Sequence, residues 1–397
     1  MTSLPRRPRG RPLVVDGVAR HMLSAPAGTG GFDLVESSYD NAGNVIHAEA
    51  PFSFWDDGSG VVMDAREIRR HRGASLRHTI DFANRKNATY VLSAANFIQF
   101  EGFSEERRSS YDRLRRELER LDVPLVVLGL GVQAPRRWNP RDHRLPSEAV
   151  ELMKFLGDRC KLVSVRGEFS ASVLRDYAGV RNSVVTGCPS FFQDACAFES
   201  LYRALPDPGQ GLTAFSVTNL SKPAEVEIFR RALDAGHTWV DVRHPDDGGA
   251  MLRRGLEART IEAPTPPDVE EVASAADLSA VDRRHFVDYR SWIDFARRSV
   301  RFGYGTRLHA NMALLLAGKP ALWIVHDSRT IEATNALCLP TTTLQDVQKA
   351  DLNDLERAID YTPMFDNLTD LFARFNQFLE LSGLPQVEAP FSKGRAA

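Results

Sequence analysis

The stretch "TYVLSAANFIQFEGFSEERRSSYDRLRRELERLDVPLVVLGLGVQ" (residues 89–133) decides the fold class. It begins with a short apolar segment at 89–94 and ends with a second apolar run at 123–133. Between them, Tyr111 and the leucines that follow recur at helical spacing, which is typical of an amphipathic helix. A strand, a helix and a second strand in this order form a βαβ unit, and such units build parallel sheets covered by helices. The stretch therefore predicts an α/β protein.

The same alternation continues on both sides of a turn-rich segment, "LYRALPDPGQG" (201–211), and 397 residues exceed one ordinary core. We therefore expect two Rossmann-like domains facing across a cleft, with ligands beyond the carboxyl ends of the strands. The predicted parts are a disordered basic tail at 1–13, an N-terminal Rossmann-like domain at 14–205, a C-terminal Rossmann-like domain at 206–365, and a C-terminal helix and tail at 366–397.

Composition excludes several classes of partner and ligand. The net charge of −2 gives no general attraction to nucleic acid, so we expect no nucleic-acid partner. The four cysteines form no CxxC pair or other zinc motif, so we expect free thiols and no metal ion. Cys188, between Gly187 and Pro189, has the character of a small buried residue.

The apolar segments are too short for a membrane protein. The basic N-terminus "MTSLPRRPRGRP" (1–12) is followed by no apolar segment typical of a secretory signal, and the run "VPLVVLGLGV" (123–132) cannot span a bilayer. We expect a cytoplasmic protein without a transmembrane segment. The basic tail leaves open a peripheral contact with anionic lipid at the inner face of the membrane, and a homo-oligomer is also left open.

A second stretch, "GTRLHANMALLLAGKPALWIVHDSRTIE" (305–332), places cations at a glycine-rich turn. Arg307 and His309 lie where the turn enters an apolar helix, and Thr306 is a candidate for its N-cap. A helix N-terminus favours a phosphate or a carboxylate, and an arginine can bind such a group through two parallel hydrogen bonds. The turn is therefore a candidate anion site.

Further cations lie beside neighbouring predicted strands. Lys319 precedes the strand at 320–327, His326 lies at its end and Arg329 follows it, while Arg166 closes an earlier strand. His326 and Arg329 are the weaker candidates, because a charged strand end often only meets solvent. Together these side chains would suit an anion that carries two charged groups.

The stretch at 305–332 resembles the C-terminal signature of the polysaccharide pyruvyl transferases, an Arg-Leu-His turn followed by an apolar helix and Gly-Lys-Pro. "LVSVRGEFSASVLRDYAGVRNSVVTGCPSFF" (162–192) is similar to the central signature of that family, and "SYDNAGNVIHAEA" (38–50) resembles its N-terminal Asn-x-Gly motif. The resemblance extends over roughly residues 30 to 345, in the order that the family shows.

The resemblance implies a two-domain fold like that of the GT-B glycosyltransferases. It also implies transfer of a pyruvyl group from phosphoenolpyruvate onto two hydroxyls of a saccharide, either a polysaccharide or a lipid-linked precursor, with release of phosphate. The donor substrate would bind the C-terminal domain and the saccharide acceptor the N-terminal domain, and no cofactor is implied. Catalytic positions map onto Arg166, Arg307 and His309. The donor-binding set adds Lys319 from the motif and Arg329 from its charge.

The acceptor contacts are expected at the N-terminal motif and at two strand ends. The candidates are Asn41, Gly43, Asn44, Asn96 and Gln133. Many family members have an aspartate at the position of Asn44, and an asparagine cannot act as a base, so Asp40 or Glu49 would have to replace it. A simple turn without acceptor contacts explains the motif equally well.

Two other functions fit the same pattern. One is a GT-B glycosyltransferase that uses a nucleotide-sugar donor, since a fold alone does not assign a function. The other is a non-catalytic saccharide-binding protein. The presence of the Arg-Leu-His turn and of Arg166 argues against it.

Overall fold

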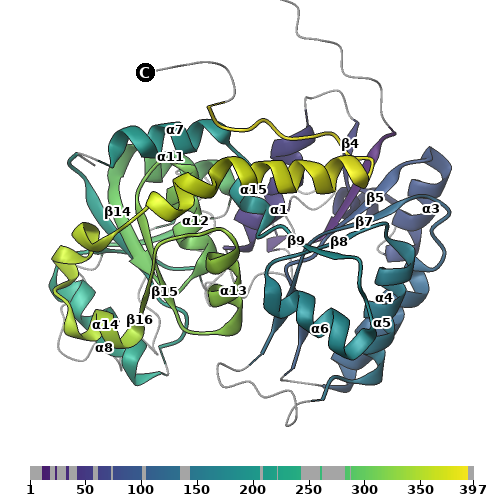
Figure 1. Ribbon diagram of the computed structural model, residues 1–397, viewed down its shortest axis with the longest axis horizontal. Coiled ribbons are helices and arrows are strands. Elements are labelled where there is room, and N and C mark those ends of the chain that lie inside the picture. The colour runs from purple at the N-terminus through teal and green to yellow at the C-terminus, as the bar shows by residue number, and fades with distance from the viewer. Residues whose placement is uncertain are drawn as a thin grey trace, which may run out of the picture. The chain divides into compact units, whose positions relative to one another are not determined.

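The chain folds into two compact units, each built on its own sheet (Figure 1). Unit 1 comprises Met1–Gly17, Pro51–Thr186 and Phe372–Val387, and unit 2 comprises Val18–Ala50, Gly187–Leu371 and Glu388–Ala397. The computed structural model describes residues 11–17, 23–24, 33–34, 43–56, 61–72, 75–100, 104–134, 144–205, 209–220, 222–242, 260–261, 282–286 and 288–391. Among these residues, no helix combines the length and the apolar character needed to cross a membrane.

Unit 1 contains a parallel sheet in the order β4-β1-β5-β7-β8-β9, with β6 also paired to β7. Its strands are β1 (Leu13–Gly17), β4 (Val62–Asp64), β5 (Thr89–Ser93), β6 (Asn96–Gln99), β7 (Leu125–Gln133), β8 (Val163–Val165) and β9 (Ser183–Val185). Its helices include α2 (Ala65–Arg72), α3 (Leu76–Lys86), α4 (Glu105–Leu118), α5 (Ser147–Arg159) and α6 (Glu168–Ala178).

The predicted βαβ unit is confirmed as β5, α4 and β7. The first eight residues of β7 are buried, as its continuous apolar sequence predicts for a central parallel strand. Ser104 caps α4 by accepting a hydrogen bond from the backbone N–H of Arg107 at 3.2 Å, and Tyr111 and Leu118 are buried. The predicted tail at 1–13 lies outside the described residues as far as residue 10, but Leu13 already belongs to β1.

An ion pair between the buried Asp16 and the half-buried Arg69 lies at the end of β1. The Arg69 guanidinium donates to both carboxylate oxygens of Asp16, at 2.8 and 2.9 Å, and the Tyr90 hydroxyl donates to the same carboxylate at 2.5 Å. Burial alone would raise the pKa of Asp16, but Arg69 and Tyr90 outweigh it and lower the pKa. The charged form of Asp16 is therefore stabilised by folding.

We expect Asp16→Asn to lower the free energy of unfolding by about 3 kcal/mol, because it leaves the Arg69 charge without its buried partner. Since folding lowers the pKa of Asp16, the pair stabilises the protein above the pKa of the unfolded chain, and this contribution is lost as the pH falls through the lower, folded pKa. Urea unfolding at neutral and acidic pH should therefore show a smaller loss of stability in acid for the variant. Asp122→Asn, at an exposed position, is the control and should change little.

Unit 2 contains a second sheet in the order β12-β13-β11-β10-β14-β15-β16, parallel except for β12. Its strands are β10 (Leu212–Ser216), β11 (Thr238–Val240), β12 (Thr260–Ile261), β13 (Arg283–Phe286), β14 (Val300–Gly305), β15 (Ala321–Val325) and β16 (Thr341–Thr343), and a separate pair is β2 (Leu23–Ser24) with β3 (Asp33–Leu34). Its helices include α7 (Ala195–Ala204), α8 (Pro223–Asp234), α11 (Tyr289–Ser299), α12 (Leu308–Leu316), α13 (Ser328–Ala336) and α14 (Leu344–Lys349), with the 3₁₀ helices η1 (Pro189–Phe192) and η3 (Leu352–Ala358).

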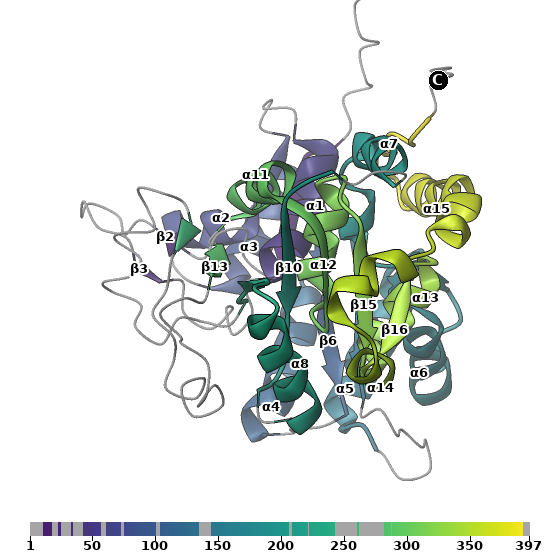
Figure 2. The same cartoon turned by 90° about the vertical axis from the view of Figure 1, so that its left-hand side faces the viewer.

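Helices cover both faces of this sheet. On one face Phe215 of β10 contacts Phe229 of α8 in a shared core with Val347 of α14, and Figure 2 shows the sheet from the side of α8 and α14. On the other face the Trp323 indole donates to the Leu308 carbonyl of α12 at 3.1 Å. The two parallel α/β sheets confirm the predicted fold class.

Unit 2 resumes before the turn-rich segment at 201–211, where the sequence suggested the junction between the two domains. Unit 2 resumes at Gly187, so η1 and α7 belong to it. Gly318, two residues after α12, lies so close to Ser200 of α7 that an added Cβ would lie 2.7 Å from the serine Cβ. Two further helices, α1 (Asn44–Trp55) and α15 (Thr362–Leu381), have residues in both units.

Candidate functional site

The ends of three neighbouring strands bring the predicted cations of unit 2 to one side of its sheet. β10, β14 and β15 are parallel, and their register pairs Ser216 with Gly305 and Gly305 with Trp323. The residues that follow these strands therefore share one edge, which we call the carboxyl edge of unit 2. Arg307, His326 and Arg329 all lie along it.

A close backbone approach sets the position of Arg307. A Cβ at Gly305 would lie 2.2 Å from the Ser216 carbonyl oxygen, so this position requires glycine. Arg307 is the N-cap residue of α12, in place of the predicted Thr306, and its guanidinium donates to the carbonyls of Val217 at 3.1 Å and Thr218 at 2.9 Å. These two bonds fix the orientation of the guanidinium.

Glu225, which the sequence did not single out, holds the loop that carries those carbonyls. Its side chain on α8 is fully buried. One carboxylate oxygen accepts hydrogen bonds from the backbone N–H groups of Thr218 at 2.6 Å and Asn219 at 3.0 Å and from the Thr306 hydroxyl at 3.0 Å. The exposed Lys222 ammonium lies 3.9 Å from the other oxygen. Only tertiary structure shows these contacts, since a glutamate in a first helical turn is ordinary.

The "HDSR" segment (326–329) is largely a helix cap. Asp327 caps α13 by accepting from the Thr330 backbone N–H at 2.9 Å, and the Arg329 guanidinium donates to Asp327 at 2.8 and 2.5 Å. Burial alone would raise the pKa of Asp327, but the Arg329 guanidinium outweighs it and lowers the pKa to about 2. Arg329 is therefore paired with a carboxylate.

His326 is buried beside this cap. Its Nε2 lies 3.6 Å from the Asp327 carboxylate, and its Nδ1 has no hydrogen-bond partner within the part of the chain that the structure describes. Burial lowers the pKa of His326 despite the attraction of Asp327, so this imidazole is neutral near pH 7.

Lys319 lies at the opposite edge of the sheet from Arg307. It precedes β15, whereas Arg307 follows β14, and the two strands run parallel with Gly303 beside Ala321. About six residues of extended chain separate the two positions along the strand direction, which corresponds to about 20 Å. The structure therefore does not bring Lys319 to the carboxyl edge.

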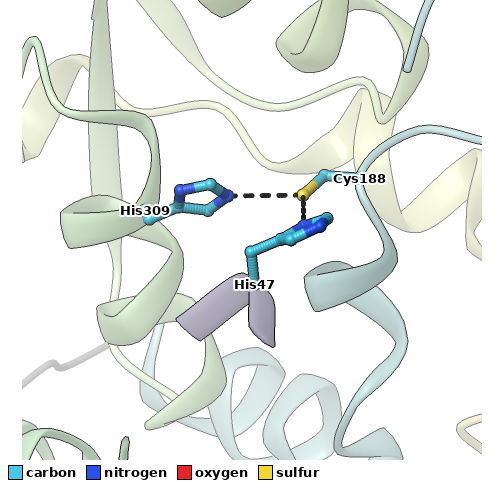
Figure 3. Close-up of side chains that lie close together, drawn as sticks. All are labelled: His47, Cys188 and His309. Carbon is cyan, nitrogen blue, oxygen red and sulfur yellow. Dashed lines mark hydrogen bonds between the residues drawn. The ribbon is translucent and has the colours of Figure 1, made fainter. Parts of the chain in front are cut away.

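His309, in the first turn of α12, instead meets Cys188 and His47 (Figure 3). The Cys188 Sγ lies 3.5 Å from His309 Nε2 and 3.7 Å from His47 Nδ1, and the ring centroids of the histidines are 5.8 Å apart. All three side chains are buried, at 6% exposure for His309 and none for the other two. We call these three residues the imidazole–thiol cluster.

Rigid elements position the cluster. His47 lies on α1, and Cys188 is the N-cap residue of η1, directly after Gly187, whose φ of 83° favours glycine. On α12, the Asn311 amide donates to the carbonyls of Gly305 and Leu322, which fixes the helix to β14 and β15. The prediction that Cys188 is buried is confirmed, but its two imidazole neighbours were not predicted.

The remaining predicted residues are distributed over both units. In unit 1, Arg166 follows β8 with 1% exposure, its Cδ against Gly131, and the half-buried Gln133 ends β7. Asn96 begins β6, but its side chain lies outside the described residues, as do Asn41 and Asp40. In unit 2, Gly43 precedes α1, Asn44 begins it and the half-buried Glu49 lies within it.

Comparison with known proteins gives one family. The model of the polysaccharide pyruvyl transferase family matches residues 63–328. No curated protein sequence matches the chain. Among solved structures, the S. aureus MnaA–UDP co-structure is similar at 13% identity and a TM-score of 0.45, covering 96% of this chain and 99% of that one.

Two further structures show a similar level of likeness. A putative UDP-N-acetylglucosamine 2-epimerase from Listeria monocytogenes has 11% identity and a TM-score of 0.45, with 96% and 98% of the two chains covered. A UDP-forming alpha,alpha-trehalose-phosphate synthase from Burkholderia vietnamiensis has 13% identity and a TM-score of 0.42, with 94% and 98% covered. Similarity at this level says nothing about substrate.

Proposed function

This chain belongs to the polysaccharide pyruvyl transferase family, and on that premise we propose that it transfers the pyruvyl group of phosphoenolpyruvate onto two hydroxyls of a saccharide. The observation that carries the proposal is the Arg-Leu-His turn at the carboxyl edge of unit 2, with an oriented guanidinium at Arg307 and an imidazole two residues later. The saccharide is a polysaccharide or a lipid-linked precursor of one.

The reaction forms two bonds and breaks two at the same carbon. The C2 carbon of phosphoenolpyruvate gains bonds to both saccharide hydroxyl oxygens, and it loses its bond to the phosphate oxygen and the second bond of its double bond to the methylene carbon. One of the two hydroxyl protons is transferred to the methylene carbon, which becomes a methyl group. The other is transferred to the released phosphate. The enzyme therefore has to bind an anion, deliver a proton to carbon and accept protons from two hydroxyls.

Arg307 is the proposed anchor for the donor anion. Its carbonyl contacts hold the planar guanidinium at the edge where ligands bind in parallel sheets, beside the N-terminus of α12. A guanidinium in a fixed orientation can bind a carboxylate or phosphate through two parallel hydrogen bonds.

His309 is the proposed proton donor to the methylene carbon. An imidazole can both give and take a proton near neutral pH, which suits a step that moves a proton from oxygen to carbon. The family resemblance also assigns Arg166 and Lys319 to the donor, and its N-terminal motif suggests Asn41, Gly43 and Asn44 for the acceptor. Charge adds Arg329 to the donor set, and the strand-end rule adds Asn96 and Gln133 to the acceptor set. The Asp327 partner of Arg329 and the position of Lys319 make these two the weaker members of the donor set.

Phosphoenolpyruvate should raise the midpoint of thermal unfolding, and Arg307→Ala should abolish the shift. A ligand at 100 times its Kd stabilises the folded state by about 2.7 kcal/mol, and this gain disappears with the anchor. Arg166→Ala should have the same effect. Because Arg166 is buried, Arg166→Lys provides a second variant in case the alanine variant does not fold.

Uridine diphosphate is the control ligand in this experiment, because a nucleotide-sugar transferase would bind it. A shift with phosphoenolpyruvate and none with uridine diphosphate is the expected result. The reverse pattern would contradict a pyruvyl donor and favour a nucleotide-sugar transferase.

A further inference from the structure

The imidazole–thiol cluster has the composition of a metal site. One ligand atom each from His47, Cys188 and His309 can be chosen so that all lie within 4.8 Å of one another, and the side chains converge from three segments (Figure 3). We propose that these three residues bind one zinc ion and leave its fourth position open. This site goes beyond the proposed function and does not depend on it.

The distances at the sulfur already match those around zinc. With Zn–S near 2.3 Å, Zn–N near 2.05 Å and a tetrahedral angle, a sulfur and a nitrogen on the same ion lie about 3.6 Å apart. The Cys188 Sγ lies 3.5 Å from His309 Nε2 and 3.7 Å from His47 Nδ1. The two imidazole nitrogens would need to come to about 3.4 Å, a movement that rotation of the side chains can supply.

The donor atoms select the class of ion. A thiolate with two imidazoles is a soft to borderline set, which favours zinc over magnesium or calcium, the ions that prefer oxygen ligands. Three protein ligands with a fourth position open are typical of zinc sites that take a water or another small ligand. The Ser190 hydroxyl, 3.0 Å from the Cys188 Sγ, is placed to donate a hydrogen bond to the thiolate and hold its orientation.

The three stretches that resemble the family signatures meet at this cluster. His47 belongs to the stretch at 38–50, Cys188 to that at 162–192 and His309 to that at 305–332. The ligands lie on α1, at the start of η1 and on α12, and regular elements hold a coordination geometry more firmly than loops do. Sequence spacing could not show the site, because 121 residues separate Cys188 from His309 and 141 separate it from His47.

Cobalt provides a spectroscopic test on the full chain after treatment with a chelator. Co²⁺ should bind at one ion per chain and show a thiolate-to-cobalt charge-transfer band together with the visible bands of tetrahedral cobalt, and Zn²⁺ should abolish both. Cys188→Ser should remove the charge-transfer band. His47→Asn should weaken Zn²⁺ binding at least roughly 100-fold, beyond the 10–100-fold cost of losing an outer partner of a ligand.

Cys160→Ser and Cys196→Ser are the matched controls, and both should bind as the unaltered chain does. Burial raises the pKa of the Cys160 thiol to about 12, so this thiol stays protonated, while Cys196 is exposed and would report chance surface binding. A charge-transfer band that survives in Cys188→Ser, or no saturable cobalt binding by the folded chain, would overturn the site. Circular dichroism of each variant checks that it is folded.

Zinc on His309 would also affect turnover, and this consequence rests on the proposed function. A nitrogen that binds zinc has no lone pair for a proton, so Zn²⁺ should inhibit pyruvyl transfer and a chelator should restore it. His47→Asn should need at least roughly 10-fold more Zn²⁺ for the same inhibition. Turnover that requires zinc would contradict the proton role of His309, while the cobalt titration decides the site independently.

Discussion

Replacing His309 with asparagine should lower kcat for pyruvyl transfer by roughly 10²–10⁴-fold, the range that the loss of a general acid or base costs. Asparagine keeps a polar side chain at the start of α12 but cannot deliver a proton to the methylene carbon. Since Arg307 remains in place, phosphoenolpyruvate should still raise the midpoint of thermal unfolding. Turnover is measured as phosphate release in the presence of a chelator, so that bound metal does not affect the comparison.

His237→Asn is the matched control for this variant. His237 is also a buried histidine of unit 2, with its Nδ1 2.9 Å from the Tyr304 hydroxyl, but it precedes β11 and so lies at the opposite edge of the sheet. Its loss should lower stability and leave kcat nearly unchanged. Near-normal turnover by His309→Asn would show that His309 has only a structural role.

Arg307→Lys should lower kcat/KM nearly as far as Arg307→Ala, by roughly 100-fold, the cost of misplacing a substrate by about 1 Å. The lysine keeps the positive charge but has no planar fork to bridge the carbonyls of Val217 and Thr218. The donor would then be held by a mobile point charge. Steady-state kinetics with phosphoenolpyruvate as the varied substrate measures the loss.

Arg301→Lys, on the same strand, is the control for this comparison. Arg301 contacts Glu356 and Thr213 and lies toward the start of β14, away from the carboxyl edge. Its replacement should leave kcat/KM nearly unchanged. Equal kinetics for Arg307→Lys and the unaltered chain would mean that charge alone, and not orientation, is what Arg307 contributes.

The sequence correctly predicted the helices and strands whose buried residues can be recognised from the apolar pattern of the segment itself. Continuous apolar strands such as β7 and one-sided helices such as α4 bury what their own sequence shows, so the fold class followed from residues 89–133. By contrast, α1 was not predicted, because it contains Pro51, and a proline normally ends a helix. His47 lies on this helix and was missed with it.

The candidate site depends on contacts that sequence distance hides. Lys319 is near Arg307 in the chain but one strand length away in the fold, whereas Val217, 90 residues from Arg307, accepts its hydrogen bond. Glu225 contacts the site in a similar way: it lies on α8 but accepts hydrogen bonds from Thr218 and Thr306, and Thr306 is 81 residues away in the chain. The Arg-Leu-His motif could be read from the sequence, but its carbonyl partners and the thiol beside His309 could not.

Phosphate release from phosphoenolpyruvate, with and without a glycan that carries a free diol, either 4,6 or vicinal, tests the proposed reaction most directly. The full chain is incubated with the donor, a panel of such glycans and a chelator, and phosphate and the modified glycan are both quantified. The expected result is phosphate release that depends on one of the glycans, with one pyruvate ketal formed for each phosphate released. If the folded chain shows the same phosphate release with and without every glycan, or forms no ketal while a nucleotide sugar is consumed instead, the proposed function is contradicted.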